Sequence, residues 1–137
     1  MRVVLDEGAF IPERAYSTDA GMDLRTPVEV TIPAHGSATI DTGVHMAIEP
    51  GWFGKLESKS GLNVKHDIVS LGGVIDSNFV GSIRVKLYNM SDMDYHFERG
   101  DKIVQIIIQP CGLCAVEVVD SLEDTERGSN GFGSTGR

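Results

Sequence analysis

The sequence of 137 residues lacks the features that mark membrane and secreted proteins. No run of about 18 apolar residues is present, so we expect no membrane-spanning helix. The start, MRVVLDEGAF, has no apolar signal core followed by a small-residue cleavage site, which predicts a cytoplasmic protein. The two cysteines of a chain in such a compartment need not pair with each other.

Metal-binding and histidine-based catalytic motifs are also missing. The one CxxC, from Cys111 to Cys114, has neither a second pair nor a histidine at ligand spacing, which argues against zinc. A redox role lacks the βαβ pattern that usually accompanies it. The four histidines form no HxH or HExxH pattern, so we expect no imidazole-based catalyst.

Positive charge is scarce. Twelve lysines and arginines against twenty aspartates and glutamates give a formal net charge of -8. A nucleic-acid-binding protein generally carries a basic face, whereas this chain repels phosphate at long range. We therefore expect no nucleic-acid partner, and any polyanionic ligand must be held locally by fixed donors, a helix end, a few cations or a metal.

What the sequence does contain is a series of short alternating segments. The stretches VEVTI (28–32), HMAIE (45–49) and SIRVKLYN (82–89) alternate apolar and polar residues, as half-buried strands do. The stretch KIVQIIIQ (102–109) has almost no polar face, which predicts a strand covered by the core on one side and a subunit interface on the other. The pattern indicates an all-β fold.

Two local features interrupt the strands. The stretch EPGWFG (49–54) places Pro50 and Gly51 before an aromatic pair and predicts a hairpin. One short helix is expected from Ser60 to Asp67, with Ser60 as its N-cap.

The last part of the chain differs in composition from the rest. From about Asp120 onward, DSLEDTERGSNGFGSTGR is polar, rich in glycine and no longer alternates. We expect a single domain over residues 1–119 and a flexible arm over residues 120–137 that becomes ordered on a ligand.

Four segments carry residues suited to phosphate or metal chemistry. In SKSGL (58–62), the start of the short helix offers unpaired N–H groups that could bind a phosphate, and Lys59 adds a positive charge. The alternative is a capped helix with a solvated lysine. In AGMDLR (20–25), Asp23 faces outward if Met22 and Leu24 point inward, and it could then hold waters of a bound Mg²⁺. A solvated strand aspartate is the alternative.

The third segment, GGVIDSNFVGSIRV (72–85), predicts a hairpin with Asp76 and Phe79 at its mouth. An aspartate held there could orient and deprotonate a water molecule. The alternative is a turn aspartate that caps its own backbone, with Phe79 in the core. The fourth, RGDKIVQ (99–105), offers Gln105, but a turn followed by a strand also explains it.

The arm carries the last candidates. The guanidinium group of Arg127 can donate two parallel hydrogen bonds to phosphate oxygens, and Ser134 and Thr135 add hydroxyl donors. Phe132 lies between two glycines, where stacking on a planar base is an economical use for an isolated ring. A disordered tail without a function is the alternative.

Read in order, AGMDLR, SKSGL, GVIDSNFVG, RGDKIVQ and RGSNGFGSTG resemble the five motifs of the trimeric dUTP diphosphatases (dUTPases), from Ala20 to Gly136. The resemblance implies a jelly-roll-like β-barrel and a homotrimer whose three active sites are each assembled from all three chains. It also implies Mg²⁺-assisted hydrolysis of dUTP to dUMP and pyrophosphate, which limits uracil in DNA and supplies dUMP for thymidylate synthesis.

The resemblance also assigns roles to residues. Asp76 would activate a water for in-line attack on the α-phosphorus, Asp23 would steady the hydrated Mg²⁺, and Phe79 would pack under the deoxyribose. The remaining contacts fall into three groups: phosphate contacts from Lys59, Ser60, Gly61 and Gln105; uracil contacts from Leu71, Gly72, Gly73 and Val74; and arm contacts from Arg127, Phe132, Gly133, Ser134 and Thr135.

Some positions depart from the family pattern, and other functions stay open. Lys59 stands where the family usually has arginine, and Phe79 replaces a tyrosine. A dCTP deaminase-related enzyme would need a glutamate base, for which no candidate lies near the predicted hairpin. A dUTP-binding regulator that signals to a protein partner and a purely structural barrel subunit are further alternatives.

Overall fold

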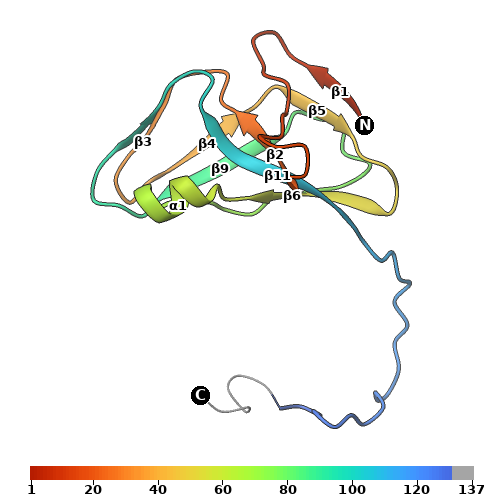
Figure 1. Ribbon diagram of the computed structural model, residues 1–137. Coiled ribbons are helices and arrows are strands. Elements are labelled where there is room, and N and C mark those ends of the chain that lie inside the picture. Colours follow the sequence, from red (N-terminus) through yellow and green to blue (C-terminus); the bar gives the residue numbers. More distant parts are fainter. Residues whose placement is uncertain (131–137) are drawn as a thin grey trace.

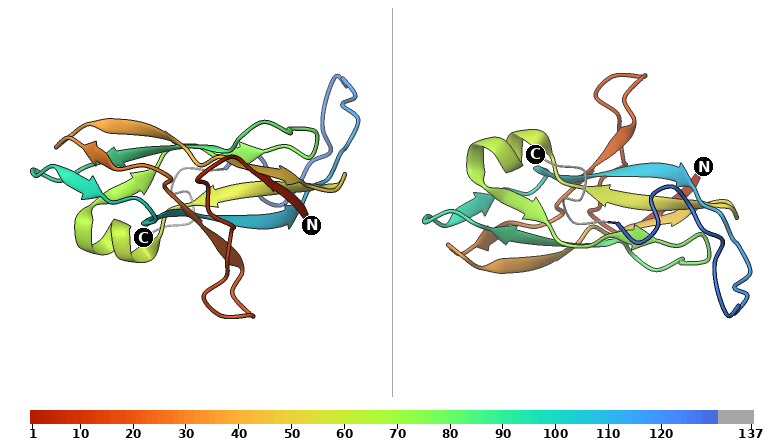
Figure 2. Two further views of the ribbon diagram at one scale, coloured as in Figure 1. Left: turned by 90° about the horizontal axis from the view of Figure 1, so that it is seen from above. Right: turned by 90° about the horizontal axis from the view of Figure 1, so that it is seen from below.

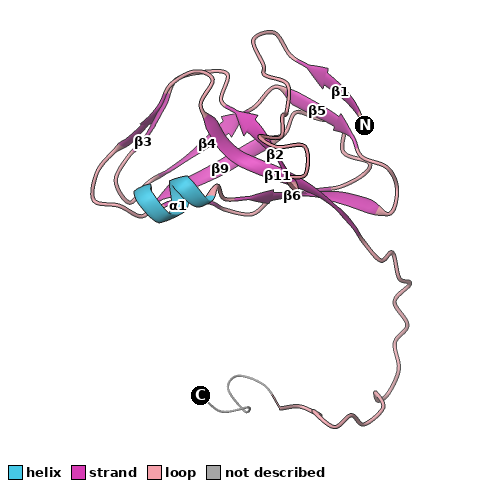
Figure 3. Cartoon of the chain, viewed as in Figure 1, coloured by secondary structure: helices cyan, strands magenta, loops and turns pink. Residues whose placement is uncertain are grey.

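The computed structural model describes residues 1–130, which form β-strands and one short helix (Figure 3). The predicted all-β class with a single short helix is therefore confirmed. In chain order (Figure 1), the elements are β1 (Arg2–Leu5), β2 (Gly21–Arg25), β3 (Val30–Ile32), β4 (Ser37–Asp41), β5 (Val44–Ala47), β6 (Trp52–Glu57), α1 (Ser60–His66), β7 (Ile68–Ser70), β8 (Val74–Ile75), β9 (Arg84–Asn89), β10 (Tyr95–Phe97) and β11 (Lys102–Pro110).

The strands form four antiparallel sheets. The largest has the order β2-β11-β6-β8, a second has the order β4-β9-β7, and two pairs, β1-β5 and β10-β3, complete them. Most strands run along the long direction of the molecule when it is seen from above or below (Figure 2). Neighbouring strands are far apart in sequence, so the fold depends on long-range pairing.

One hydrophobic core joins all of these sheets. Its buried side chains come from both larger sheets and both strand pairs, and they include Leu24, Ile32, Val85, Phe97 and Ile106. Fully burying an aliphatic or aromatic side chain of this size contributes about 1.5–3 kcal/mol relative to leaving it exposed. The core therefore holds in place the strands that carry the candidate site.

The helix lies where the sequence predicts it, but its cap differs. Helix α1 begins at Ser60, and Lys59 in extended conformation is the N-cap, with no side-chain capping bond. The assignment of Ser60 as N-cap is therefore wrong by one residue. Asp67 ends the helix in the left-handed region, with φ 54°. Within residues 1–130, no helix has the length and apolar character needed to cross a bilayer.

The turn at Pro50 and Gly51 is present, but the predicted hairpin is not. The Trp52 N–H donates to the Glu49 carbonyl oxygen (3.1 Å), which closes the turn. Strand β5 pairs with β1, however, whereas β6 pairs with β11 and β8. The turn connects two sheets, because both edges of β6 are occupied by β11 and β8 and β5 pairs with β1 in another sheet.

The last strand ends at Pro110, ahead of the predicted boundary at residue 119. Residues 111–130 contain no strand and lead away from the sheets (Figure 1). Val116 and Val118, on either side of Glu117, are 93% and 94% exposed. These apolar side chains lie between β11 and the predicted arm and are exposed in the single chain.

We expect Phe97→Ala to lower the free energy of unfolding by about 3–5 kcal/mol, because it leaves a cavity in the shared core. Urea unfolding at fixed protein concentration measures this loss. Tyr16→Ala is the matched control, since Tyr16 is an exposed aromatic residue, and its loss should stay below about 1 kcal/mol. Equal losses for the two variants would contradict a core centred on Phe97.

Candidate active site

Strand β11 lies between β2 and β6, so that residues from these three strands lie side by side across the sheet. Gln105 lies opposite Asp23 of β2 on one edge and opposite Glu57 of β6 on the other. Its side-chain amide donates to the Ser58 carbonyl oxygen (3.3 Å). Gly21 makes room for this side chain, since a Cβ at that position would collide with the Gln105 amide. The motifs around Asp23, Lys59 and Gln105 therefore meet within a single chain.

Asp23 is buried, which corrects the prediction that it faces outward. Its residue is only 7% exposed, and Met22 and Leu24 beside it are buried as well. One edge of β2 is covered by β11, and on the other the Asp23 N–H donates to the Glu13 carbonyl oxygen (2.8 Å). The Asp23 side chain is buried on its own face of β2 because Lys59 and Lys102 cover its carboxylate.

Two ammonium groups neutralise this buried carboxylate. Lys59 donates to Asp23 Oδ1, and Lys102 Nζ lies 2.7 Å from Oδ2. Burial by itself would raise the pKa of Asp23, but the hydrogen bonds and charges of Lys102 and Lys59 outweigh it and hold the pKa below its ordinary value of 3.8. Asp23 is therefore ionised at neutral pH, as a buried charge with two paired partners can be.

The same pairing bears on metal binding. Among residues 1–130, no group of three or more histidine, cysteine, aspartate or glutamate side chains could hold a metal ion. Both carboxylate oxygens of Asp23 already accept from lysines. As it stands in the chain, Asp23 does not fit a metal-binding role, and that role stays a prediction.

The start of α1 lies directly beside this cluster. Lys59 follows β6 and turns its ammonium group toward Asp23, whereas Ser60 and Gly61 are exposed. A Cβ placed on Gly61 would meet nothing within 4 Å, so a ligand can approach the backbone closely there. The alternative of a solvated Lys59 is therefore wrong, because this side chain belongs to a buried ion pair.

The second part of the candidate site is the Asp76 segment, which we define as residues 71–83. The Phe79 N–H donates to the Asp76 carbonyl oxygen (3.1 Å), and this bond closes the predicted turn. The predicted hairpin is wrong, however, because β8 pairs with β6 whereas β9 pairs with β4 and β7 in another sheet. The turn is thus a crossing between two sheets.

Glycines shape the first half of the Asp76 segment. Gly72 and Gly73 have φ of 77° and 126°, which glycine adopts without strain. The Gly73 carbonyl accepts from the Leu56 N–H (2.8 Å), and a Cβ on Gly73 would collide with Leu56. The backbone from Leu71 to Val74 is therefore held between two strands, since the Leu71 N–H donates to the Lys86 carbonyl oxygen of β9 (2.9 Å) and Gly73 and Val74 contact β6.

Phe79 is 43% exposed, so the alternative that places it in the core is wrong. Its ring lies over Gly81, where a Cβ would come within 2.7 Å of the ring. Asp76, Leu71 and Val74 are exposed on the same segment. A carboxylate, an aromatic ring and a rigid stretch of backbone are thus presented together to a ligand.

The two parts adjoin along β6 in one chain. Val74 and Ile75 pair with Lys55 and Gly54, and the Gly73 carbonyl accepts from the Leu56 N–H. The Ser70 N–H donates to Ser58 Oγ (2.9 Å) beside the Asp23 cluster. Within residues 1–130, no hydrogen bond or ion pair joins the Asp76 carboxylate to the cluster.

The arm contributes one described candidate. Arg127 Nε donates to the Asn130 carbonyl oxygen (3.0 Å), and the Gly128 N–H donates to the Thr125 carbonyl oxygen (3.0 Å), so this stretch forms a compact turn. The other arm candidates, Phe132, Gly133, Ser134 and Thr135, lie outside the described residues.

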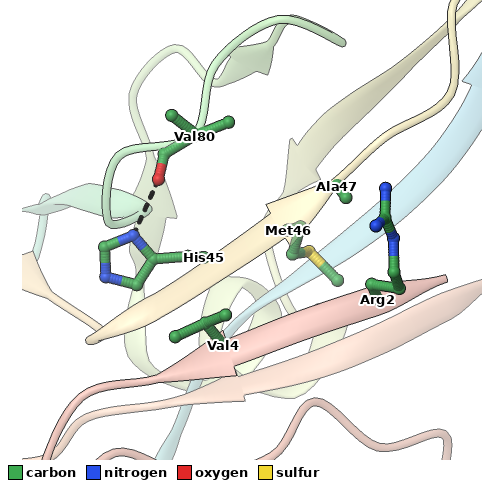
Figure 4. Close-up of a pocket in the computed structure, with 6 residues that line it drawn as sticks. All are labelled: Arg2, Val4, His45, Met46, Ala47 and Val80. Atoms are coloured by element: carbon green, nitrogen blue, oxygen red, sulfur yellow. Dashed lines mark hydrogen bonds between the residues drawn. The ribbon is translucent and has the colours of Figure 1, made fainter.

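Two residues were missed by the sequence analysis. Lys102 lies in RGDKIVQ, but only the pairing of β11 with β2 reveals its contact with Asp23. His45 lines a surface pocket of about 430 Å³ whose other lining residues are Arg2, Val4, Met46, Ala47 and Val80 (Figure 4). No short motif around His45 marks it, because its partners come from distant segments.

We expect Asp23→Asn to destabilise the protein at neutral pH, because Lys59 and Lys102 lose their carboxylate. The pKa of Asp23 is lowered in the folded state, so the stability it contributes is present above its ordinary pKa of 3.8 and is lost as the pH falls through the folded value. Unfolding of both proteins should therefore be measured from neutral to acidic pH. A stability difference that stays constant with pH would contradict this assignment.

Comparison with known proteins identifies the family of the chain. A model of the family described as dUTPase matches residues 7–136. The probable deoxyuridine 5'-triphosphate nucleotidohydrolase of Schizosaccharomyces pombe is 42% identical over 132 residues, which cover 96% of this chain and 94% of the relative. The deoxyuridine 5'-triphosphate nucleotidohydrolase of Paramecium bursaria Chlorella virus 1 is 40% identical over 132 residues, with coverage of 96% and 94%.

Solved structures agree as well. The dUTPase of Staphylococcus bacteriophage 80alpha with dUPNHPP superposes with a TM-score of 0.94 at 29% identity and covers 99% of this chain and 98% of its own. A mutant dUTPase from phage phi11 of S. aureus, described with a structural Mg(II) ion, has a TM-score of 0.83 at 27% identity, with coverage of 90% and 98%. The predicted jelly-roll-like fold is thereby confirmed. The chain belongs to the dUTPase family.

Proposed function

We propose that this protein hydrolyses dUTP to dUMP and pyrophosphate. Family membership supports the reaction, and relatives with this name are about 40% identical over nearly the whole chain. The observation that carries the proposal is the exposed Asp76 carboxylate on a closed turn beside the exposed Phe79 ring. A carboxylate in that setting can hold and deprotonate a water molecule next to a bound nucleoside.

The reaction needs little covalent chemistry from the protein. Asp76 takes a proton from the water, whose oxygen forms a bond to the α-phosphorus, while the bond from that phosphorus to the bridging oxygen breaks and pyrophosphate leaves. Such phosphoryl chemistry depends mainly on positioning and on neutralising charge around the phosphates. Exposed N–H groups at Ser60 and Gly61, with Gln105 and Arg127, are the proposed phosphate contacts.

Selection of the base is assigned to the rigid first half of the Asp76 segment. Backbone groups from Leu71 to Val74 can read the uracil edge because Gly72, Gly73 and the bond to Leu56 fix them in place. A wrong base would leave some of these groups unpaired, which is costly in a closed site. Phe79 is proposed to pack under the deoxyribose, where a 2'-hydroxyl would not fit.

The active site is proposed to be shared between the chains of a homotrimer. Within the described residues, no hydrogen bond or ion pair of one chain links the Asp76 carboxylate to the Asp23 cluster. Ile107 and Ile108 are only partly buried, and Val116 and Val118 are exposed, which leaves apolar surface for neighbouring chains to cover. The arm would then reach the site of another subunit.

Mg²⁺ is proposed as the cofactor, bound to the triphosphate, where it would offset the charge of the phosphate oxygens. Family membership supports it, although Asp23 as paired here does not. The reaction itself is proposed to occur in the cytoplasm, to limit uracil in DNA and to supply dUMP for thymidylate synthesis.

We expect Asp76→Asn to lower kcat for dUTP by about 10²–10⁴-fold, because the amide cannot accept the proton of the attacking water. The KM should change far less. Asp92→Asn is the matched control, since that carboxylate is exposed and, within residues 1–130, its one polar contact is with His35. Pyrophosphate release from dUTP, dCTP, dTTP and UTP with Mg²⁺ is the measurement. Full activity of the Asp76 variant, or equal turnover of all four nucleotides, would refute the assignments.

We expect a chain without residues 120–137 to fold but to lose pyrophosphate release, because the closing arm is gone. Circular dichroism and the melting temperature report folding, and the dUTP assay reports activity. An active truncated chain would contradict the role of the arm. Tight dUTP binding by the intact protein without turnover would favour the dUTP-binding regulator instead.

A further inference from the structure

His45 links two segments that are distant in the sequence. It lies on β5, opposite Val4 of β1. Its Nδ1 lies 2.8 Å from the carbonyl oxygen of Val80 (Figure 4), and its Nε2 lies 3.2 Å and 3.3 Å from the two carboxylate oxygens of Asp6. One ring therefore bridges the connection after β1 and the Asp76 segment.

Both partners of the ring are acceptors. A backbone carbonyl and an ionised carboxylate offer only lone pairs, so each bond requires a proton on the nitrogen that faces it. Neutral imidazole carries one proton, and either tautomer would turn a nitrogen lone pair toward an acceptor oxygen. The two contacts coexist only when His45 is an imidazolium.

The charges around the ring agree with this state. The hydrogen bond to the Val80 carbonyl and then the bond to Asp6 raise the pKa of His45 above its ordinary 6.5, and burial opposes them more weakly. Asp41 of β4 adds a further attraction. Two positive charges oppose these attractions. Arg2 lines the same pocket, and Arg84 pairs with Asp41 (3.2 Å) and offsets part of the charge of that carboxylate.

Ile75, which pairs with Gly54 and is buried, anchors the Asp76 turn on one side, and Val80 is the first anchor point after the turn. Further along the segment, the Ile83 carbonyl accepts from the Thr42 hydroxyl (2.7 Å), and the Ile83 N–H donates to the Val44 carbonyl oxygen (2.9 Å). Between Phe79, which closes the turn, and Ile83, which joins the sheets, the His45 bond holds the backbone at Val80 and the Ser82 hydroxyl donates to Asp41.

We propose that His45, as an imidazolium, is a positioning residue that fixes the Asp76 segment and makes nucleotide binding there weaken as the pH rises. The inference rests on the proposed function, since it takes this segment as the nucleotide site. The pKa of His45 is raised in the folded state. The contribution of the imidazolium to holding the segment is therefore fully present below pH 6.5 and is lost as the pH rises through the folded pKa.

The test uses His45→Gln, whose neutral amide cannot serve both partners as a cation does. Affinity for the non-cleavable analogue dUpNHpp should be measured from about pH 5 to 8. Wild-type affinity should fall about three- to tenfold as His45 deprotonates, while the variant should be weak and nearly independent of pH. His35→Gln is the matched control, because His35 also faces one carboxylate, that of Asp92, and it should follow the wild type.

A second variant and a second readout guard against a simple folding defect. Asp6→Asn keeps the Val80 bond but removes the carboxylate, so the pH dependence should move to lower pH, and NMR titration of the His45 ring should show the same displacement. Amide hydrogen exchange over residues 77–82 should be faster in His45→Gln than in the wild type. This exchange readout needs no nucleotide.

The outcomes separate the two proposals. If the intact chain neither binds dUpNHpp nor hydrolyses dUTP, the proposed function fails. Faster exchange in His45→Gln would still support the anchoring role of His45 in that case. If wild type and His45→Gln share one pH dependence, or if exchange over residues 77–82 is unchanged, the inference about His45 is overturned even in an active enzyme.

Discussion

The pairing of β11 along both of its edges is the constraint on which the site depends. Because Gln105 lies opposite Asp23 on one side and Glu57 on the other, segments far apart in the sequence are aligned in one row. The row directs Lys59 and Lys102 toward the same buried carboxylate. A buried charge with two partners tolerates few arrangements, so this ion cluster fixes the end of β6 and with it the start of α1.

The Asp76 segment follows a different design. It crosses between two sheets, and its exposed side chains are held by backbone contacts: Gly73 to Leu56 at one end and Ile83 to Thr42 and Val44 at the other. His45 adds an anchor between the turn and the second sheet. A rigid support with an exposed carboxylate suits a reaction in which positioning supplies most of the rate enhancement. The proposed trimer would bring this support to the phosphate-binding end of another chain.

Local features were predictable from the sequence, and pairing was not. The alternation in SIRVKLYN marks β9, and the letters SGLNVKH mark α1, because side-chain periodicity is a local property. Both predicted hairpins are wrong because distant strands occupy the edges that a hairpin would use. The burial of Asp23 was missed for the same reason, since Lys59 and Lys102 reach it only through the sheet. Asp76 could be proposed as the catalytic residue because a turn aspartate beside an aromatic residue is readable locally, and its catalytic role stays a prediction.

The most direct test of the shared site uses mixed trimers. Chains that carry Asp76→Asn keep the arm, whereas chains cut before residue 120 keep Asp76, and each should be inactive alone. If Asp76 and the arm of one site come from different chains, co-assembly of the two should restore pyrophosphate release from dUTP. Mixed trimers verified by native mass spectrometry that remain inactive would contradict an active site built across the chains.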